Sequence, residues 1–205
     1  QPVLRRVLFE LSPHVAADPQ AALHLADALW AQYFIEFRLI AASILGMLTP
    51  LSPQDPLPRI QEWRAASDED LLLDALAGDS LARYRQHNTP EFLTALSGWL
   101  GSSEIPDINF GLRALHAMLQ SATYTNLPAI YRIIAPLFQN TAKVLRPFLL
   151  DILLLLAKQA PQETAFFLLQ LLNKDKNPAA IWLVRHSLDA FPQKHQTNLR
   201  AALRG

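Results

Sequence analysis

Apolar residues recur at three- and four-residue spacings along nearly the whole chain, which is the period of amphipathic helices. Proline is frequent and stands mostly between the periodic segments, where it separates short helices from one another. The pattern therefore predicts an all-α protein. We expect helices near residues 3–11, 19–31, 33–48, 55–65, 68–77, 79–86, 90–100, 108–120, 127–139, 142–160, 161–172, 178–190 and 194–203.

Several of the predicted helix ends carry local signals. Thr89 and Asn177 each precede a proline, which puts a side-chain acceptor at the N-cap and proline at the first helical position. Ser67 followed by Asp70 approximates a capping box. Pro136 lies within a helical pattern, and we expect it to kink the helix.

A repeat becomes visible when five strongly apolar segments are aligned. They read FRLIAASIL, LDALAGDSL, LRALHAMLQ, LDILLLLAK and VRHSLDAFP, and their starts are 36, 39, 38 and 34 residues apart. This period is typical of two-helix solenoid repeats, in which each pair buries its apolar face only by stacking on its neighbours. The sequence predicts one domain over residues 1–205, a right-handed α-solenoid of about six antiparallel helix pairs with a concave face.

The second residue of each aligned segment is charged, and the sign alternates along the series. These residues are Arg38, Asp74, Arg113, Asp151 and Arg185. Stacked repeats would place them in a ladder along the concave face. One interpretation is that the ladder only joins neighbouring repeats, with each exposed pair contributing about 0–1 kcal/mol. The other is that Asp74 and its arginine neighbours line a ligand groove.

Composition narrows the possible functions. The chain has no cysteine, which excludes disulfides and thiolate metal sites and fits a cytoplasmic location. Its formal net charge is zero, so bulk charge does not point to nucleic acid or to a membrane. The most apolar stretches, 148–157 and 165–172, are too short to cross a bilayer. The six histidines show no HxxxH or HExxH spacing, and no glycine-rich phosphate loop is present, so we expect no metal and no cofactor.

The tryptophans occur in amphipathic segments at positions typical of a core. We expect Trp30, Trp63, Trp99 and Trp182 to be packed inside the protein. Trp63 and Trp182 are the two that could also reach a groove.

One stretch is more specific than composition. The segment LWAQYFIEFRLIA contains Leu29-Trp30 followed by Glu36, Arg38 and Ala41. It resembles the LW-x5-E-x-R-x2-A signature of the bacterial DNA alkylation repair family, the AlkD-like HEAT-repeat glycosylases. Three later segments, 60–77, 108–119 and 144–161, resemble the family's motifs in the same order. The resemblance implies a HEAT-like fold that wraps duplex DNA and excises positively charged alkylpurines.

The resemblance also implies roles for individual residues. Asp74 falls at the family's catalytic aspartate, and Arg113 falls at a DNA-contacting arginine. The family has an aromatic residue where this chain has Asp70, and a tryptophan where it has Asp151. An aromatic face holds a cationic purine through cation–π attraction of roughly 0.5–2 kcal/mol. The two acids cannot supply that stacking face.

These observations lead to three hypotheses. The first is an AlkD-like protein with a degenerate active site that binds duplex DNA in a groove lined by Arg38, Asp70, Asp74, Arg113, Asp151 and Arg185. The second is a HEAT-like scaffold that binds a protein or peptide and has no enzymatic activity. The third is an active alkylpurine glycosylase of altered specificity. In each case we expect a cytoplasmic monomer without a membrane partner.

Overall fold

The computed structural model describes residues 2–48, 55–121, 124–139, 141–174 and 177–204. Within these ranges the chain is helical and contains no β-strand, so the predicted all-α class is confirmed. None of the helices in these ranges is long and apolar enough to cross a membrane. The chain forms two compact units, residues 1–94 and 95–205. The single domain over residues 1–205 stays a prediction.

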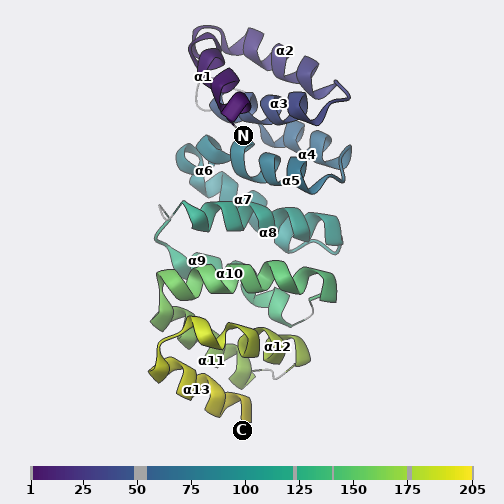
Figure 1. Cartoon of the computed structure of the whole chain (residues 1–205). Helices are drawn as coiled ribbons and strands as arrows, with labels where there is room; N and C mark the ends of the chain where they lie inside the picture. Colours follow the sequence, from purple (N-terminus) through teal and green to yellow (C-terminus); the bar gives the residue numbers. More distant parts are fainter. Residues whose placement is uncertain (1, 49–54, 122–123, 140, 175–176, 205) are drawn as a thin grey trace. The chain divides into compact units, whose positions relative to one another are not determined.

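The helices of the first unit form two layers (Figure 1). In one layer α3 (Ile35–Leu48) contacts both α1 (Pro2–Ala17) and α5 (Asp70–Ala75). We call it the α1–α3–α5 layer. The other contains α2 (Pro19–Trp30) and α4 (Leu57–Ala65). A π-helix, η1 (Leu76–Ser80), continues α5 and is followed by α6 (Ala82–His87).

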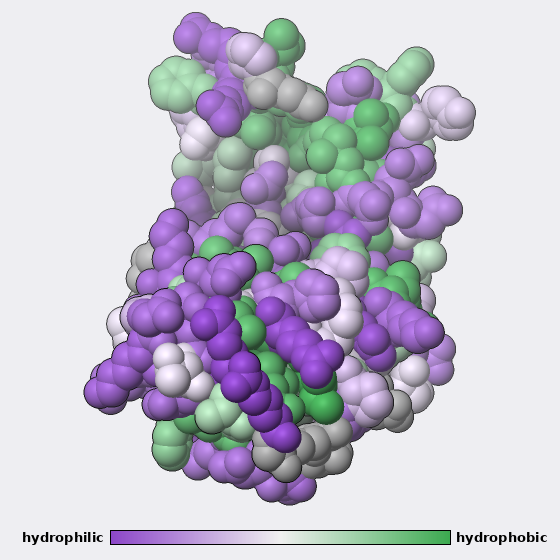
Figure 2. All heavy atoms as spheres, turned by 60° about the horizontal axis from the view of Figure 1, so that its bottom comes forward, coloured by the Kyte–Doolittle hydropathy of each residue, from purple (hydrophilic) through white to green (hydrophobic). Residues whose placement is uncertain are grey.

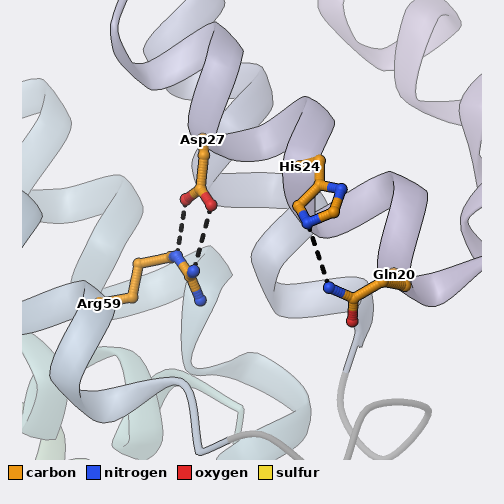
Figure 3. Close-up of polar contacts among 4 residues, drawn as sticks. All are labelled: Gln20, His24, Asp27 and Arg59. Atoms are coloured by element: carbon orange, nitrogen blue, oxygen red, sulfur yellow. Dashed lines mark hydrogen bonds and ion pairs between the residues drawn. The ribbon is translucent and has the colours of Figure 1, made fainter.

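Two contacts join α2 to α4. Trp30 and Trp63 stack with ring centroids 4.4 Å apart and an interplanar angle of 4°. Such a pair contributes about 0.5–1.5 kcal/mol beyond the apolar area that it buries. Beside it, Arg59 Nε and Nη2 donate to the two carboxylate oxygens of Asp27 at 2.6 and 3.1 Å (Figure 3). The bidentate geometry sets the orientation of α4 against α2.

The second unit repeats this arrangement. Helix α7 (Thr89–Leu100) leads into it from the first unit. Helix α10 (Arg146–Gln159) contacts both α8 (Ile105–Gln120) and α12 (Pro178–Ser187), which together form the α8–α10–α12 row (Figure 1). Its other elements are α9 (Leu127–Ile134), η2 (Ala135–Phe138), η3 (Lys143–Leu145), α11 (Pro161–Lys174), η4 (Leu188–Ala190) and α13 (Gln193–Arg204).

An aromatic contact also joins α9 to α11. The Tyr131 ring stacks on Phe167 with centroids 4.8 Å apart, and its hydroxyl forms a 2.9 Å hydrogen bond with the hydroxyl of Thr164. Phe138, in η2, adds an edge-to-face contact to the same Phe167 ring. Consecutive helix pairs are therefore joined on this side by stacked rings, as they are by Trp30 and Trp63 in the first unit.

One predicted N-cap is confirmed by a local side-chain hydrogen bond. The Asn177 side chain accepts from Ala180 N–H at 2.9 Å, which confirms that N-cap. Near Pro136 the α-helix ends, at Ile134, and a 3-10 helix follows with Pro136 as its second residue. Two other signals are wrong. Thr89 donates its hydroxyl to the carbonyl of Arg85, four residues earlier, and α5 begins after Glu69 without a side-chain cap.

The helix predicted over residues 68–77 departs most from expectation. Its α-helical part covers only Asp70–Ala75, and the π-helix follows. Here α3 approaches the π-helix backbone directly, because Gly46 has no side chain to hold it away. A Cβ atom at Gly46 would lie 2.0 Å from the carbonyl oxygen of Asp79. Next to this contact, Ser80 Oγ donates to the Ala42 carbonyl of α3 at 2.8 Å.

This close approach predicts the effect of replacing Gly46. Gly46→Ala should lower the free energy of unfolding by roughly 1–3 kcal/mol, since rigid backbone must move to admit the methyl group. Gly78→Ala is the matched control, because a Cβ there meets no atom within 4 Å. Urea denaturation of both variants measures the effect. Equal unfolding midpoints for the two would contradict the contact.

Candidate functional site

A pocket of about 390 Å³ lies in the α1–α3–α5 layer of the first unit. Three segments form its walls: α1, α3 and the continuous run of α5 and η1. The lining residues are Leu4, Arg5, Leu8, Leu39, Ile40, Ser43, Leu71, Asp74, Ala75 and Asp79. A concave, mostly apolar site with a few convergent polar groups is the usual form of a small-ligand site. None of these ten residues is aromatic.

Helical periodicity explains how these residues meet. Leu4 and Leu8 are four residues apart on α1, as are Leu39 and Ser43 on α3, so each pair lies on one face of its helix. Leu71 is likewise four residues before Ala75. The apolar members of these faces form the walls, and Asp74, which is exposed, brings a carboxylate to them.

The second acid, Asp79, reaches the pocket because of the π-helix. In a continuous α-helix, residues five apart point about 140° away from one another, so Asp74 and Asp79 would not share a face. The wider turn over Leu76–Ser80 changes that direction, and both residues line the pocket. Single π-helical turns are found frequently at functional sites.

The surroundings of Asp79 alter its acidity. Although the residue is exposed as a whole, desolvation raises the pKa of its carboxyl group above the usual 3.8. The Arg85 guanidinium and a hydrogen bond with Ser43 lower the pKa, but these effects are smaller. Arg85 is held in place, since its Nη1 donates to the Ala77 carbonyl of the π-helix at 2.8 Å. Asp79 therefore takes up a proton more readily than an ordinary aspartate.

The predicted site residues of the first unit fall into two kinds. Asp74 lines the pocket, and Asp70 is the exposed first residue of the same helix. Arg38 has a structural contact. Its Nε donates to the carbonyl oxygens of Trp30 and Gln32, at 3.1 and 3.0 Å, and its guanidinium lies 5.7 Å from the Trp30 ring. Trp30 is the last residue of α2, so the helix dipole stabilises a cation at its carbonyl.

The remaining predicted residues belong to the second unit. Arg113, on α8, is only 7% exposed; its Nε donates to Asn109 Oδ1 at 3.1 Å, and its guanidinium lies 5.1 Å from the Phe148 ring of α10. Asp151, on α10, and Arg185, in the last turn of α12, are exposed. Helix α10, which carries Asp151, contacts both α8 and α12, which carry the two arginines. The ladder as a whole spans both units and stays a prediction.

The tryptophans behave largely as core residues. Trp30, Trp63 and Trp99 are buried, so Trp63 does not line a groove within its unit. Trp182 is half-buried and stacks on His186, with centroids 4.0 Å apart. No group of three or more His, Asp or Glu side chains in the described part of the chain could hold a metal ion.

Sequence reasoning missed three polar residues of the pocket: Arg5, Ser43 and Asp79. Arg5 could have been found, because it follows Leu4 in a helix whose apolar face includes Leu8. Asp79 could not, since an α-helical pattern over residues 68–77 gives no sign of a π-helical turn.

Comparison with known proteins adds one finding. The profile of a protein family described as DNA alkylation repair enzyme matches residues 1–191. No curated protein matches the chain significantly, and no solved structure does.

The acidity of Asp79 predicts a pH-dependent effect of Asp79→Asn. Because the carboxyl binds a proton more tightly in the folded than in the unfolded state, its ionisation costs stability as the pH rises from 3.8 through the raised pKa. Asp79→Asn should therefore raise the free energy of unfolding at about pH 7 and change it little at about pH 3. Urea denaturation at both pH values measures this.

A carboxyl carbon NMR titration, with Asp79→Asn identifying the signal, checks the pKa directly. A midpoint at or below 3.8 would contradict the desolvation of Asp79.

Proposed function

This chain belongs to the family of DNA alkylation repair enzymes, and we propose that it binds alkylated duplex DNA and excises bases weakly or not at all. The observation that carries the proposal is the pocket of the first unit, which has Asp74 in its wall and no aromatic side chain. Asp74 is the residue that resembles the family's catalytic aspartate.

The carboxylate of Asp74 suits a cationic lesion. Cleavage of the glycosidic bond of an alkylated purine builds positive charge on the sugar, and a nearby carboxylate stabilises that charge. What the pocket lacks is an aromatic face to hold the cationic base by stacking. Without that face the base is attracted by charge but is not held in the orientation that bond cleavage needs, and orientation contributes a large part of a catalysed rate. We therefore infer recognition with little catalysis, which is what a degenerate active site means here.

The DNA groove that we propose requires a right-handed solenoid of HEAT-like pairs. Contacts within each unit support it. In the first unit α3 lies between α1 and α5, and in the second α10 lies between α8 and α12. Arg38, Asp70 and Asp74 belong to the first series, and Arg113, Asp151 and Arg185 to the second. Their shared groove is part of the proposal.

An exposed aromatic cluster favours a second candidate function, a surface that binds a protein partner. Tyr33, Phe34 and Phe37 are 91%, 63% and 40% exposed, and neighbouring rings meet edge to face at 6.1 and 6.0 Å. Contiguous exposed rings are typical of protein-binding sites. Hydrophilic side chains cover most of the face drawn in Figure 2, although hydrophobic ones also reach the surface there.

Salt-dependent binding of duplex DNA separates the two functions. Fluorescence anisotropy should detect duplex binding at about 50 mM salt. The affinity should fall by an order of magnitude or more when the salt is raised to about 200 mM, because phosphate contacts depend on ionic strength. Failure to bind any duplex at the lower salt concentration would overturn the first function and favour the protein partner.

The contribution of Asp74 is testable with a methylated duplex. Asp74→Asn should reduce the preference for methylated over unmodified duplex about two- to fivefold, the effect of losing one exposed ion pair. Asp68→Asn is the control, since Asp68 is exposed and does not line the pocket. Release of methylated bases should stay near the uncatalysed rate. Robust release that Asp74→Asn abolishes would instead establish an active glycosylase.

A further inference from the structure

The pocket of the first unit holds a positive charge as well as two acids. Arg5, on α1, lines the same pocket as Asp74 and Asp79. Within the part of the chain that the structure describes, the Arg5 side chain makes no hydrogen bond or ion pair. Its neighbour Arg6 differs, because Arg6 Nη2 pairs with Glu10 Oε1 at 2.6 Å and its guanidinium lies 5.7 Å from the Phe9 ring.

The opposite charges come from different walls of the pocket. Arg5 is on α1, whereas the two acids are on α5 and η1, and α3 lies between these helices. Apart from Ser43, the rest of the lining is apolar: Leu4, Leu8, Leu39, Ile40, Leu71 and Ala75. This layout suits a ligand with an apolar body, a cationic part at one end and an anionic part at the other.

Arg5 is well suited to an anion such as phosphate. Its guanidinium stays charged and presents paired N–H donors that match phosphate oxygens. The acids cannot serve this end of the ligand, because they repel phosphate.

We propose that Arg5 is the phosphate-binding residue of this pocket, and that the pocket takes a nucleotide whose positively charged base faces Asp74 and Asp79. The proposal rests on the proposed function for the nature of the ligand. It adds a residue, on a helix that the aligned repeat segments do not include, and it makes the phosphate part of what the pocket selects. Arg5 thus determines specificity and need not take part in bond cleavage.

Three soluble probes test the proposal by calorimetry at about 50 mM salt, where ion pairing is weakly screened. They are 7-methylguanosine 5′-monophosphate, which carries both charges, 7-methylguanosine, which lacks the phosphate, and guanosine 5′-monophosphate, which lacks the cationic ring. We expect the doubly charged probe to bind most tightly. Arg5→Gln should weaken it about tenfold, as the loss of a charge-assisted hydrogen bond predicts, and should leave 7-methylguanosine unchanged.

Matched variants make the result specific. Arg6→Gln should leave all three affinities unchanged, because Arg6 does not line the pocket. Arg5→Lys should recover part of the loss by keeping the charge. Asp79→Asn should reduce the preference for the methylated nucleotide over guanosine monophosphate. Thermal denaturation of each variant checks that it folds.

Different outcomes separate the proposal from the function on which it rests. If Arg5→Gln weakens nucleoside and nucleotide equally, Arg5 is not the phosphate contact. If methylated duplex binds while no nucleotide does, the pocket proposal fails and the proposed function stands. If the nucleotide binds with the Arg5 dependence and no duplex binds, the pocket proposal stands and duplex recognition fails.

Discussion

The packing of α3 against the backbone of η1 is the constraint on which the first unit depends. Gly46 lets the two backbones meet at a separation that any side chain would prevent. The Ser80 hydroxyl then bonds to the Ala42 carbonyl, and Arg85 bonds to the Ala77 carbonyl of the π-helix. With η1 held in this way, Asp79 turns into the same pocket as Asp74. The π-helix, an uncommon local conformation, is thus held by its contacts with α3 and with Arg85 of α6.

Two residues of the family signature, Trp30 and Arg38, make contacts between helices of the first unit. Trp30 is buried against Trp63, and Arg38 donates to the carbonyls of Trp30 and Gln32 while lying over the same indole ring. Trp30 therefore maintains the contact of α2 with α4, and Arg38 holds α3 to the end of α2. A resemblance carried by such residues is strong evidence for the fold and says little about chemistry.

The pocket of the first unit places charged side chains in a mostly apolar lining. Desolvation raises the pKa of Asp79, although Arg85 and Ser43 oppose the shift. Carboxylates in an apolar wall attract a cation through charge alone, whereas an aromatic wall would also stack on it. This difference is why binding and catalysis are separable in the proposed function. Arg5, across the pocket, adds selection for the other end of a ligand.

The sequence by itself determined the helical class and most helix positions. Apolar spacing reports directly on which face of a helix is buried, and Asn177 caps its helix through a local hydrogen bond. The family resemblance brought Asp74 forward as a candidate, and the structure puts it in a pocket. Only the tertiary structure decided which residues line the pocket together with Asp74. Arg5 and Ser43 are distant from Asp74 in sequence. Asp79 lines the same pocket because of a π-helical turn, which the spacing of apolar residues does not predict. These depend on how closely α1, α3 and η1 pack, which is a property of the assembled helices and not of any one segment.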